Sequence, residues 1–115
     1  MNIDVWNVRG LNSLLKQNMV SRCIKYNKFH IVCLLGTHVK EKNMLAILKG
    51  FDNQFSIIHN YSSHYNGRIW ILWRADILNV QVLDVFEHII HCHVVIPDGK
   101  YFHLSMVYAL SLIHI

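Results

Sequence analysis

Asn7 is a polar side chain at a position where enzymes of the α/β class keep their chemistry. It lies near the end of a run, MNIDVWN, whose β-branched and aromatic residues predict a strand over residues 2–8. A second apolar run, residues 31–35, leads into Gly36. If these two strands are parallel neighbours, their carboxyl ends meet at one edge of a sheet, where ligands and catalytic groups gather. An amide offers a hydrogen-bond donor and an acceptor at this edge, but it cannot by itself hold a divalent cation or deprotonate water.

Histidines are the other residues that could do chemistry, since the chain has 9 of them. His88, His91 and His93 bracket Cys92, and their spacing places His91 and His93 on one face of a strand. Zinc sites usually combine two close pairs of ligands separated by a loop, and the sequence shows no second pair. We therefore interpret these histidines as exposed or half-buried strand residues.

The elements that must position Asn7 form a strand–helix–strand unit. Asn12 or Ser13 can cap a helix over residues 14–26, because the side-chain oxygen of either residue can accept a free first-turn N–H. Residues 31–35 form a continuous apolar run, which is typical of a strand buried on both faces. Such a unit predicts two parallel strands with a right-handed crossover. Five helix residues recur at helical spacing and are expected to face the core: Leu15, Met19, Val20, Cys23 and Ile24.

A second helix is predicted over residues 41–49, and short β-rich runs follow it. Pro97 and Gly99 lie in the segment PDGK, which predicts a hairpin turn, since proline fixes φ and glycine tolerates a positive φ. Helices followed by hairpins predict a mixed α/β fold with helices packed on a mixed sheet. The predicted strands are residues 55–59, 68–73, 77–85, 88–95 and 101–108.

The totals limit the class of protein. A chain of 115 residues has room for one domain, and no apolar run reaches the ~18 residues that a membrane helix needs. The first ten residues lack the apolar segment of a signal peptide, so we expect an intracellular protein. The net charge of +4 is compatible with a nucleic-acid partner but nearly uninformative, and nothing indicates an obligate protein partner or a membrane. The 3 scattered cysteines, Cys23, Cys33 and Cys92, are expected to be reduced and buried.

A series of short motifs resembles a known family. In order they are WNVRGLN (6–12), CLLGTHVKEKN (33–43), HNYSSHYNGRIWILW (59–73), EHIIHC (87–92) and VYA around Tyr108. This series resembles the N-terminal part of the endonuclease domain of plant LINE-type (non-LTR) retrotransposons. That domain belongs to the endonuclease/exonuclease/phosphatase superfamily, related to apurinic endonucleases and DNase I. The resemblance implies a partial four-layer α/β sandwich over residues 1–109, truncated in its C-terminal half. It also implies a nuclear location and Mg²⁺-dependent nicking of DNA.

The resemblance also assigns residues. Asn7 matches the family's asparagine, whose amide would orient a carboxylate or a metal-bound water. Gly36 stands where the family carries a metal-binding glutamate. Neither Asp4 nor Glu41 projects from the strand end to replace that glutamate. The family's later Asp/Asn and Asp-His clusters would follow beyond Tyr108. Because only Asn7 of this constellation is present, the resemblance implies a truncated and inactive copy that does not bind Mg²⁺. The alternatives are a non-catalytic nucleic-acid-binding remnant and a fragment that does not fold stably.

Three further residues have a nucleic-acid-binding interpretation in the family context. Asn66 and Arg68 flank the turn before a strand that would line the DNA groove, although Asn66-Gly67 is also a plain hairpin-turn signal. Tyr61 could contact a phosphate, but a tyrosine in such a loop more often packs in the core.

The last six residues, LSLIHI (110–115), have a separate interpretation. The codons CTG TCT CTT ATA CAC ATC encode this hexapeptide and look like the transposase mosaic end used in sequencing adaptors. We expect this tail to be adaptor-derived, so that the genuine polypeptide stops at Ala109. The alternative is that these residues begin another apolar strand.

Overall fold

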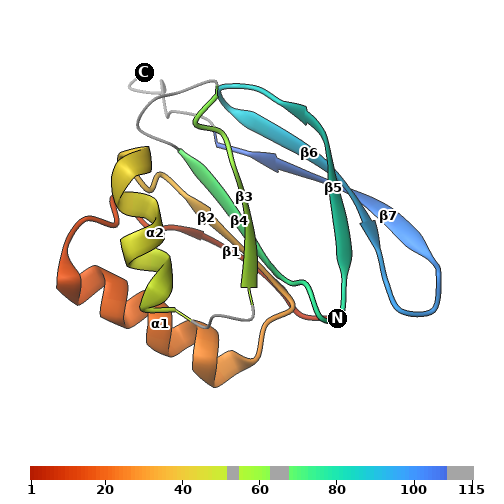
Figure 1. Ribbon diagram of the computed structural model, residues 1–115, viewed down its shortest axis with the longest axis horizontal. Helices are drawn as coiled ribbons and strands as arrows, with labels where there is room; N and C mark the ends of the chain where they lie inside the picture. The colour runs from red at the N-terminus through yellow and green to blue at the C-terminus, as the bar shows by residue number, and fades with distance from the viewer. Residues whose placement is uncertain (52–54, 63–67, 109–115) are drawn as a thin grey trace, which may run out of the picture.

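The computed structural model describes residues 1–51, 55–62 and 68–108. It contains nine elements, shown in Figure 1, in the order β1 (Ile3–Asn7), α1 (Leu14–Asn27), β2 (Ile31–Leu35), α2 (Glu41–Lys49), β3 (Phe55–His59), β4 (Ile69–Arg74), β5 (Asn79–Val85), β6 (Ile89–Val95) and β7 (Tyr101–Val107). Asn66 and the tail 110–115 lie outside the described residues, and so do the predictions made for them.

The strands form two sheets. The first sheet has the order β1-β2-β4-β3 and the second has the order β5-β6-β7. β1 and β2 are parallel, as predicted, and their register places Asn7 opposite Leu35. The remaining neighbours are antiparallel. The predicted mixed α/β class is therefore confirmed.

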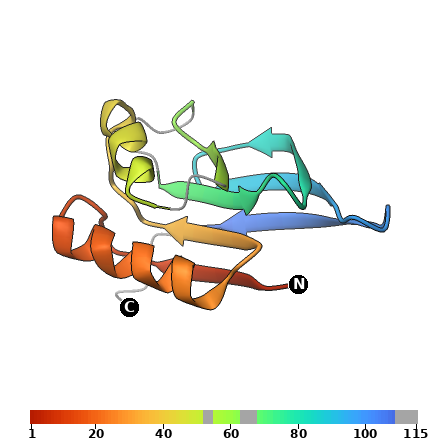
Figure 2. The same cartoon turned by 60° about the horizontal axis from the view of Figure 1, so that its bottom comes forward.

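The elements are stacked in layers. Figures 1 and 2 show both helices on one side of the first sheet and the second sheet on its other side. One apolar core joins the helices to the first sheet and includes Val20, Ile24 and Trp70. A second core lies between the sheets and includes Cys33, Ile71 and Cys92. Within the described residues the chain thus builds three layers of a sandwich, and the outer face of the second sheet carries no helix.

Helix α1 begins at the predicted residue, but the face that packs on the sheet differs in part from the predicted one. Ser13 is the cap, and its Oγ accepts the Lys16 N–H at 3.1 Å. Val20 and Ile24 are buried as predicted, but the expectation that Leu15 and Met19 face the core was wrong, because they are 73% and 55% exposed. The spacing gave two apolar stripes on α1, and only one of them can face the sheet.

Cys23 lies on the exposed stripe of α1, so the expectation that all the cysteines are buried was wrong for this residue. Cys33 and Cys92 are buried in the core between the two sheets. Burial raises the pKa of Cys33 to about 12, with smaller contributions from Cys92 and Asp4. Burial likewise raises the pKa of Cys92 to about 11.

Element boundaries follow the predictions closely, with one difference of two residues. β5 starts at Asn79 rather than at Ile77, because the N–H groups of Ile77 and Leu78 donate to the Arg74 carbonyl in the turn before it. The hairpin turn between β6 and β7 is confirmed, with Gly99 at a φ of +89°. In the described part of the chain, neither helix has the length and apolar character needed to cross a membrane.

Candidate functional site

The carboxyl ends of β1 and β2 lie side by side and remain hydrogen-bonded beyond the strands. The Val8 N–H donates to the Leu35 carbonyl at 2.9 Å, and the Gly10 N–H donates to the Gly36 carbonyl at 2.6 Å. The loops that follow the two strands therefore stay paired by backbone hydrogen bonds. This pairing places Asn7 beside Gly36, as the sequence predicted for neighbouring parallel strands.

Gly36 lies in a crowded, left-handed position. Its φ is +69°, and a Cβ built on it would meet Asn7 Oδ1 and the Tyr108 hydroxyl oxygen, each at 3.1 Å. Its N–H donates to the Arg68 carbonyl at 2.6 Å. The space that a side chain at residue 36 would enter is thus already taken by its neighbours.

Tyr108 is a site residue that the sequence analysis did not single out. It directly follows β7, and its N–H donates to the His88 carbonyl at 2.8 Å, which fixes it at this end of the sandwich. Its ring then reaches across from the second sheet to Gly36 in the first. The motif VYA was the available signal, but nothing in it indicated the direction of the ring.

Asn7 has a local structural role. Its Oδ1 accepts the Arg9 N–H at 3.2 Å, which is the hydrogen bond of an Asx-type turn. Arg9 itself has a φ of +51°. The amide of Asn7 is exposed and lies at the strand end, but its oxygen already stabilises the bend that leads the chain away from β1.

Arg68 brings a largely buried positive charge to the same end of the sheet. Its side chain is 13% exposed, and Nη2 lies 3.9 Å from Glu87 Oε1. Nη1 lies 3.5 Å from His88 Nδ1. Among the described residues its Nε is buried and makes no hydrogen bond. A donor buried without a partner is unfavourable, so Nε is an unsatisfied polar atom at this end of the sheet.

Asn60 holds this end of the two sheets together, and sequence reasoning missed it. It is fully buried. Its Oδ1 accepts the N–H groups of Arg68 and Ile69 at 2.9 and 3.0 Å, where β4 begins. Its Nδ2 donates to the Glu87 carbonyl at 2.8 Å, in the turn before β6. A polar residue directly after an apolar strand was the only signal that the sequence offered.

Tyr61 is part of the core. Its hydroxyl donates to the Val39 carbonyl at 2.7 Å and accepts the Trp70 Nε1–H at 3.2 Å. Burial raises its pKa. The structure therefore gives this residue the packing role rather than a free hydroxyl at the surface.

The donors at the strand ends do not suit Mg²⁺, which prefers carboxylate oxygens in an octahedral arrangement. Asn7 offers one amide oxygen that is already hydrogen-bonded, and Gly36 offers no side chain. The two acids weighed as replacements from the sequence are engaged elsewhere, since Asp4 accepts the Trp6 indole N–H and Glu41 lies 4.0 Å from His59. Within the described residues, no group of three or more His, Cys, Asp or Glu residues could hold a metal ion.

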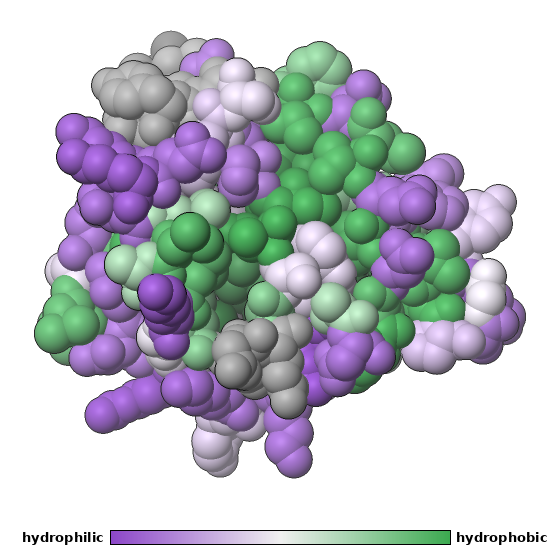
Figure 3. Space-filling model, viewed as in Figure 1, coloured by the Kyte–Doolittle hydropathy of each residue, from purple (hydrophilic) through white to green (hydrophobic). Residues whose placement is uncertain are grey.

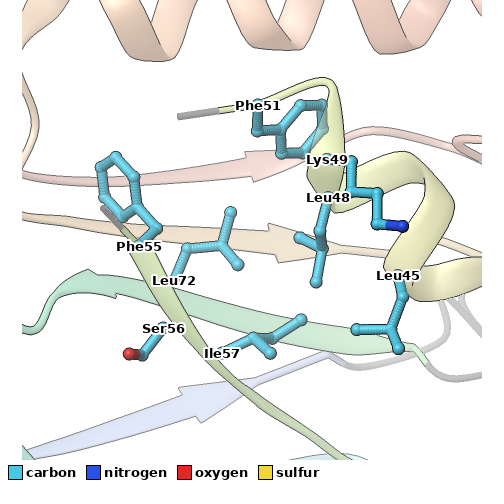
Figure 4. A pocket seen from close by; sticks show the side chains of 8 residues that line it. All are labelled: Leu45, Leu48, Lys49, Phe51, Phe55, Ser56, Ile57 and Leu72. Carbon is cyan, nitrogen blue, oxygen red and sulfur yellow. The ribbon is translucent and has the colours of Figure 1, made fainter. Parts of the chain in front are cut away.

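A groove of about 290 Å³ lies elsewhere, between α2 and strands β3 and β4. Figure 3 shows apolar side chains gathered on this face of the molecule, and Figure 4 shows Leu45 and Leu48 of α2 opposite Ile57 of β3. The residues that line it are almost all apolar, and none carries a carboxylate or an imidazole. This groove can accept an apolar group, but it has no chemistry of its own.

Comparisons with solved structures identify the fold. An endonuclease/exonuclease/phosphatase family protein from Bacteroides thetaiotaomicron matches with a TM-score of 0.67 and 10% identity, over 90% of this chain and 46% of that one. The AP endonuclease LMAP from Leishmania major matches with a TM-score of 0.67 and 18% identity, over 92% of this chain and 39% of that one. D. rerio TDP2, in a complex with a single-strand DNA product, matches with a TM-score of 0.65 and 14% identity, over 88% and 42%.

These similarities show that the chain has the fold of the endonuclease/exonuclease/phosphatase proteins. It spans less than half the length of each of these three structures. No protein-family model matches the sequence, and no curated protein matches it either.

Proposed function

We propose that this chain is a non-cleaving relative of Mg²⁺-dependent endonucleases, derived from the endonuclease domain of a plant LINE-type retrotransposon. The fold supports a phosphodiesterase ancestry, because solved proteins with this fold include an AP endonuclease and a protein in complex with a DNA product. The ordered motifs around Asn7, Gly36 and Tyr108 support the retrotransposon origin.

The crowding at Gly36 carries the proposal. Gly36 stands where the similar family carries a metal-binding glutamate, and it has no side chain. Asn7 and Tyr108 fill the space that such a side chain would enter. A hard cation therefore lacks a carboxylate there, and a water molecule at this edge lacks an anchored metal to lower its pKa. In this view Asn7 keeps the place of an active-site residue but serves as a turn-forming residue.

A plasmid-nicking assay tests the proposal. Supercoiled DNA incubated with the chain and Mg²⁺ is expected to stay supercoiled, at the level of a buffer control. Gly36→Glu is also expected not to nick, because the new side chain would start from a left-handed backbone and meet atoms at 3.1 Å. Nicking that EDTA abolishes and that Asn7→Ala removes would contradict the proposal and identify a working active site.

Arg68 favours a second candidate function, which is nucleic-acid binding without cleavage. Its backbone carbonyl accepts the Gly36 N–H, and its guanidinium lies beside Glu87 and His88 with 13% of the side chain exposed. A phosphate oxygen is a suitable acceptor for the exposed part of this guanidinium.

Gel-shift assays at increasing salt test this second candidate. Binding through phosphate contacts should weaken steeply as the salt concentration rises. Arg68→Gln should weaken binding, whereas Arg22→Gln, which removes an exposed charge from α1, should have a smaller effect. Equal effects of the two substitutions would mean that any binding reflects general charge alone.

A further inference from the structure

We propose that His93 and His103 form a two-ligand site for a transition-metal ion such as Zn²⁺, Cu²⁺ or Ni²⁺ on the outer face of the second sheet. The register of the β6–β7 hairpin places His93 directly opposite His103. On β6 the flanking residues Cys92 and Val94 are buried, so the side chain of His93 points away from the core. The two imidazoles therefore project together from the face that carries no helix within the described residues.

The spacing of the two rings fits a single metal ion. Their centroids are 5.2 Å apart and their planes are inclined by 51°. Zinc–nitrogen bonds are about 2.0–2.1 Å long, so two imidazoles bound to one tetrahedral ion have centroids roughly 5 Å apart. The centroid distance therefore allows both rings to bind one ion once a nitrogen of each ring is turned toward it.

Both rings are available for a ligand. His103 is exposed and His93 is half-buried. In the described part of the chain, no hydrogen bond engages a ring nitrogen of either residue, whereas Nδ1 of His91 on the same face lies 2.6 Å from Ser105 Oγ. Tyr101 packs against both rings, with centroids 4.9 Å from His93 and 6.1 Å from His103. This packing restricts the imidazoles and lowers the entropy lost when a metal fixes them.

The ligand chemistry separates this site from any magnesium chemistry of the fold. Imidazole nitrogens suit zinc, copper and nickel, whereas magnesium prefers oxygen ligands. With two protein ligands, the remaining coordination positions belong to water, so the ion stays exchangeable and open to a further ligand. The site is independent of the proposed function, because it uses none of the residues at the strand ends.

Calorimetric titration of the full chain tests the proposal, with the Cys23→Ser substitution present throughout to remove the exposed thiol. Zn²⁺ and Ni²⁺ are expected to bind with a one-to-one stoichiometry, and Mg²⁺ is expected to give no binding. His93→Gln and His103→Gln should each weaken Zn²⁺ binding by about tenfold or more, because each removes half of a chelate.

His91→Gln is the matched control, since His91 lies on the same strand and face but is engaged with Ser105. It should retain the affinity of the parent chain, and Zn²⁺ should raise the unfolding temperature of both. NMR line broadening by Ni²⁺ should be strongest at the imidazoles of His93 and His103. Unchanged Zn²⁺ affinity in the His93→Gln/His103→Gln double variant, or equal binding of Mg²⁺, would overturn the proposal.

Discussion

Replacing Gly36 by alanine should destabilise the fold more than its small size suggests. The residue has a φ of +69°, and a left-handed backbone costs a residue with a Cβ about 1–2 kcal/mol. The new methyl group would also lie 3.1 Å from both Asn7 Oδ1 and the Tyr108 hydroxyl, so at least one of them must move. We expect a total loss of about 2–3 kcal/mol in the free energy of unfolding.

Two further variants separate the backbone contribution from the steric one. Gly99 has a φ of +89°, but no atom lies within 4 Å of the Cβ position, so Gly99→Ala should lose only the backbone part. Tyr108→Phe removes the hydroxyl that crowds Gly36. In that background Gly36→Ala should cost less than in the parent chain, and the difference measures the contact.

Urea unfolding followed by circular dichroism gives these free energies, provided that the slope of the transition is the same for each variant. If Gly36→Ala costs no more than Gly99→Ala, the position is not crowded and the reasoning from the geometry of Gly36 is refuted. If the parent chain shows no cooperative transition, it does not fold stably by itself, which was the third interpretation of the sequence.

Three other predictions concern the thiols and the first helix. Maleimide labelling of the native chain, followed by mass spectrometry, should modify the exposed Cys23 quickly. Cys33 and Cys92 should react only after denaturant is added, because burial disfavours their thiolates. Equal labelling of all three cysteines would contradict the closed packing of the sheets. The free energy of unfolding should fall as the pH rises above about 9, since Cys33 ionises at its ordinary value of 9.0 when unfolded but only near about 12 when folded. Cys33→Ala should flatten this alkaline slope in urea titrations at several pH values, and an unchanged slope would exclude the thiol as its cause. Ser13→Ala should cost about 1 kcal/mol in urea unfolding, because the Lys16 N–H loses its cap, and a cost near zero would show that the cap is not formed.

Much of the fold was predictable because its signals are local. Residues 31–35 are apolar throughout, and the strand they form is buried on both sides, by the helices and by the second sheet. The segment PDGK contains the residues that a tight turn requires, and the turn closes there. In contrast, α1 carries apolar residues on two stripes, and only the position of the sheet decides that Val20 is buried and Met19 is exposed.

The candidate site was less predictable because its contacts depend on register across the whole sandwich. The sequence could place Asn7 beside Gly36, since both lie at the carboxyl ends of parallel strands. It could not bring Tyr108 to them, because that contact depends on how the second sheet packs on the first. The pairing of His93 with His103 could not be predicted from the sequence either, because the two residues become neighbours only through the register of the β6–β7 hairpin.

Asn60 gives this end of the sandwich a fixed width. Its amide spans from the N–H groups of Arg68 and Ile69, where β4 begins, to the Glu87 carbonyl in the turn before β6. The length of this one side chain therefore sets the distance between the two sheets here. Glutamine would carry the same donors and acceptors on a stem longer by roughly 1.5 Å, and would push the two sheets apart. Aspartate would fit the gap but would set an oxygen against the Glu87 carbonyl, where the amide now donates. A longer side chain or a charged one at residue 60 would therefore separate the two sheets, and the contact between Tyr108 and Gly36 would be lost.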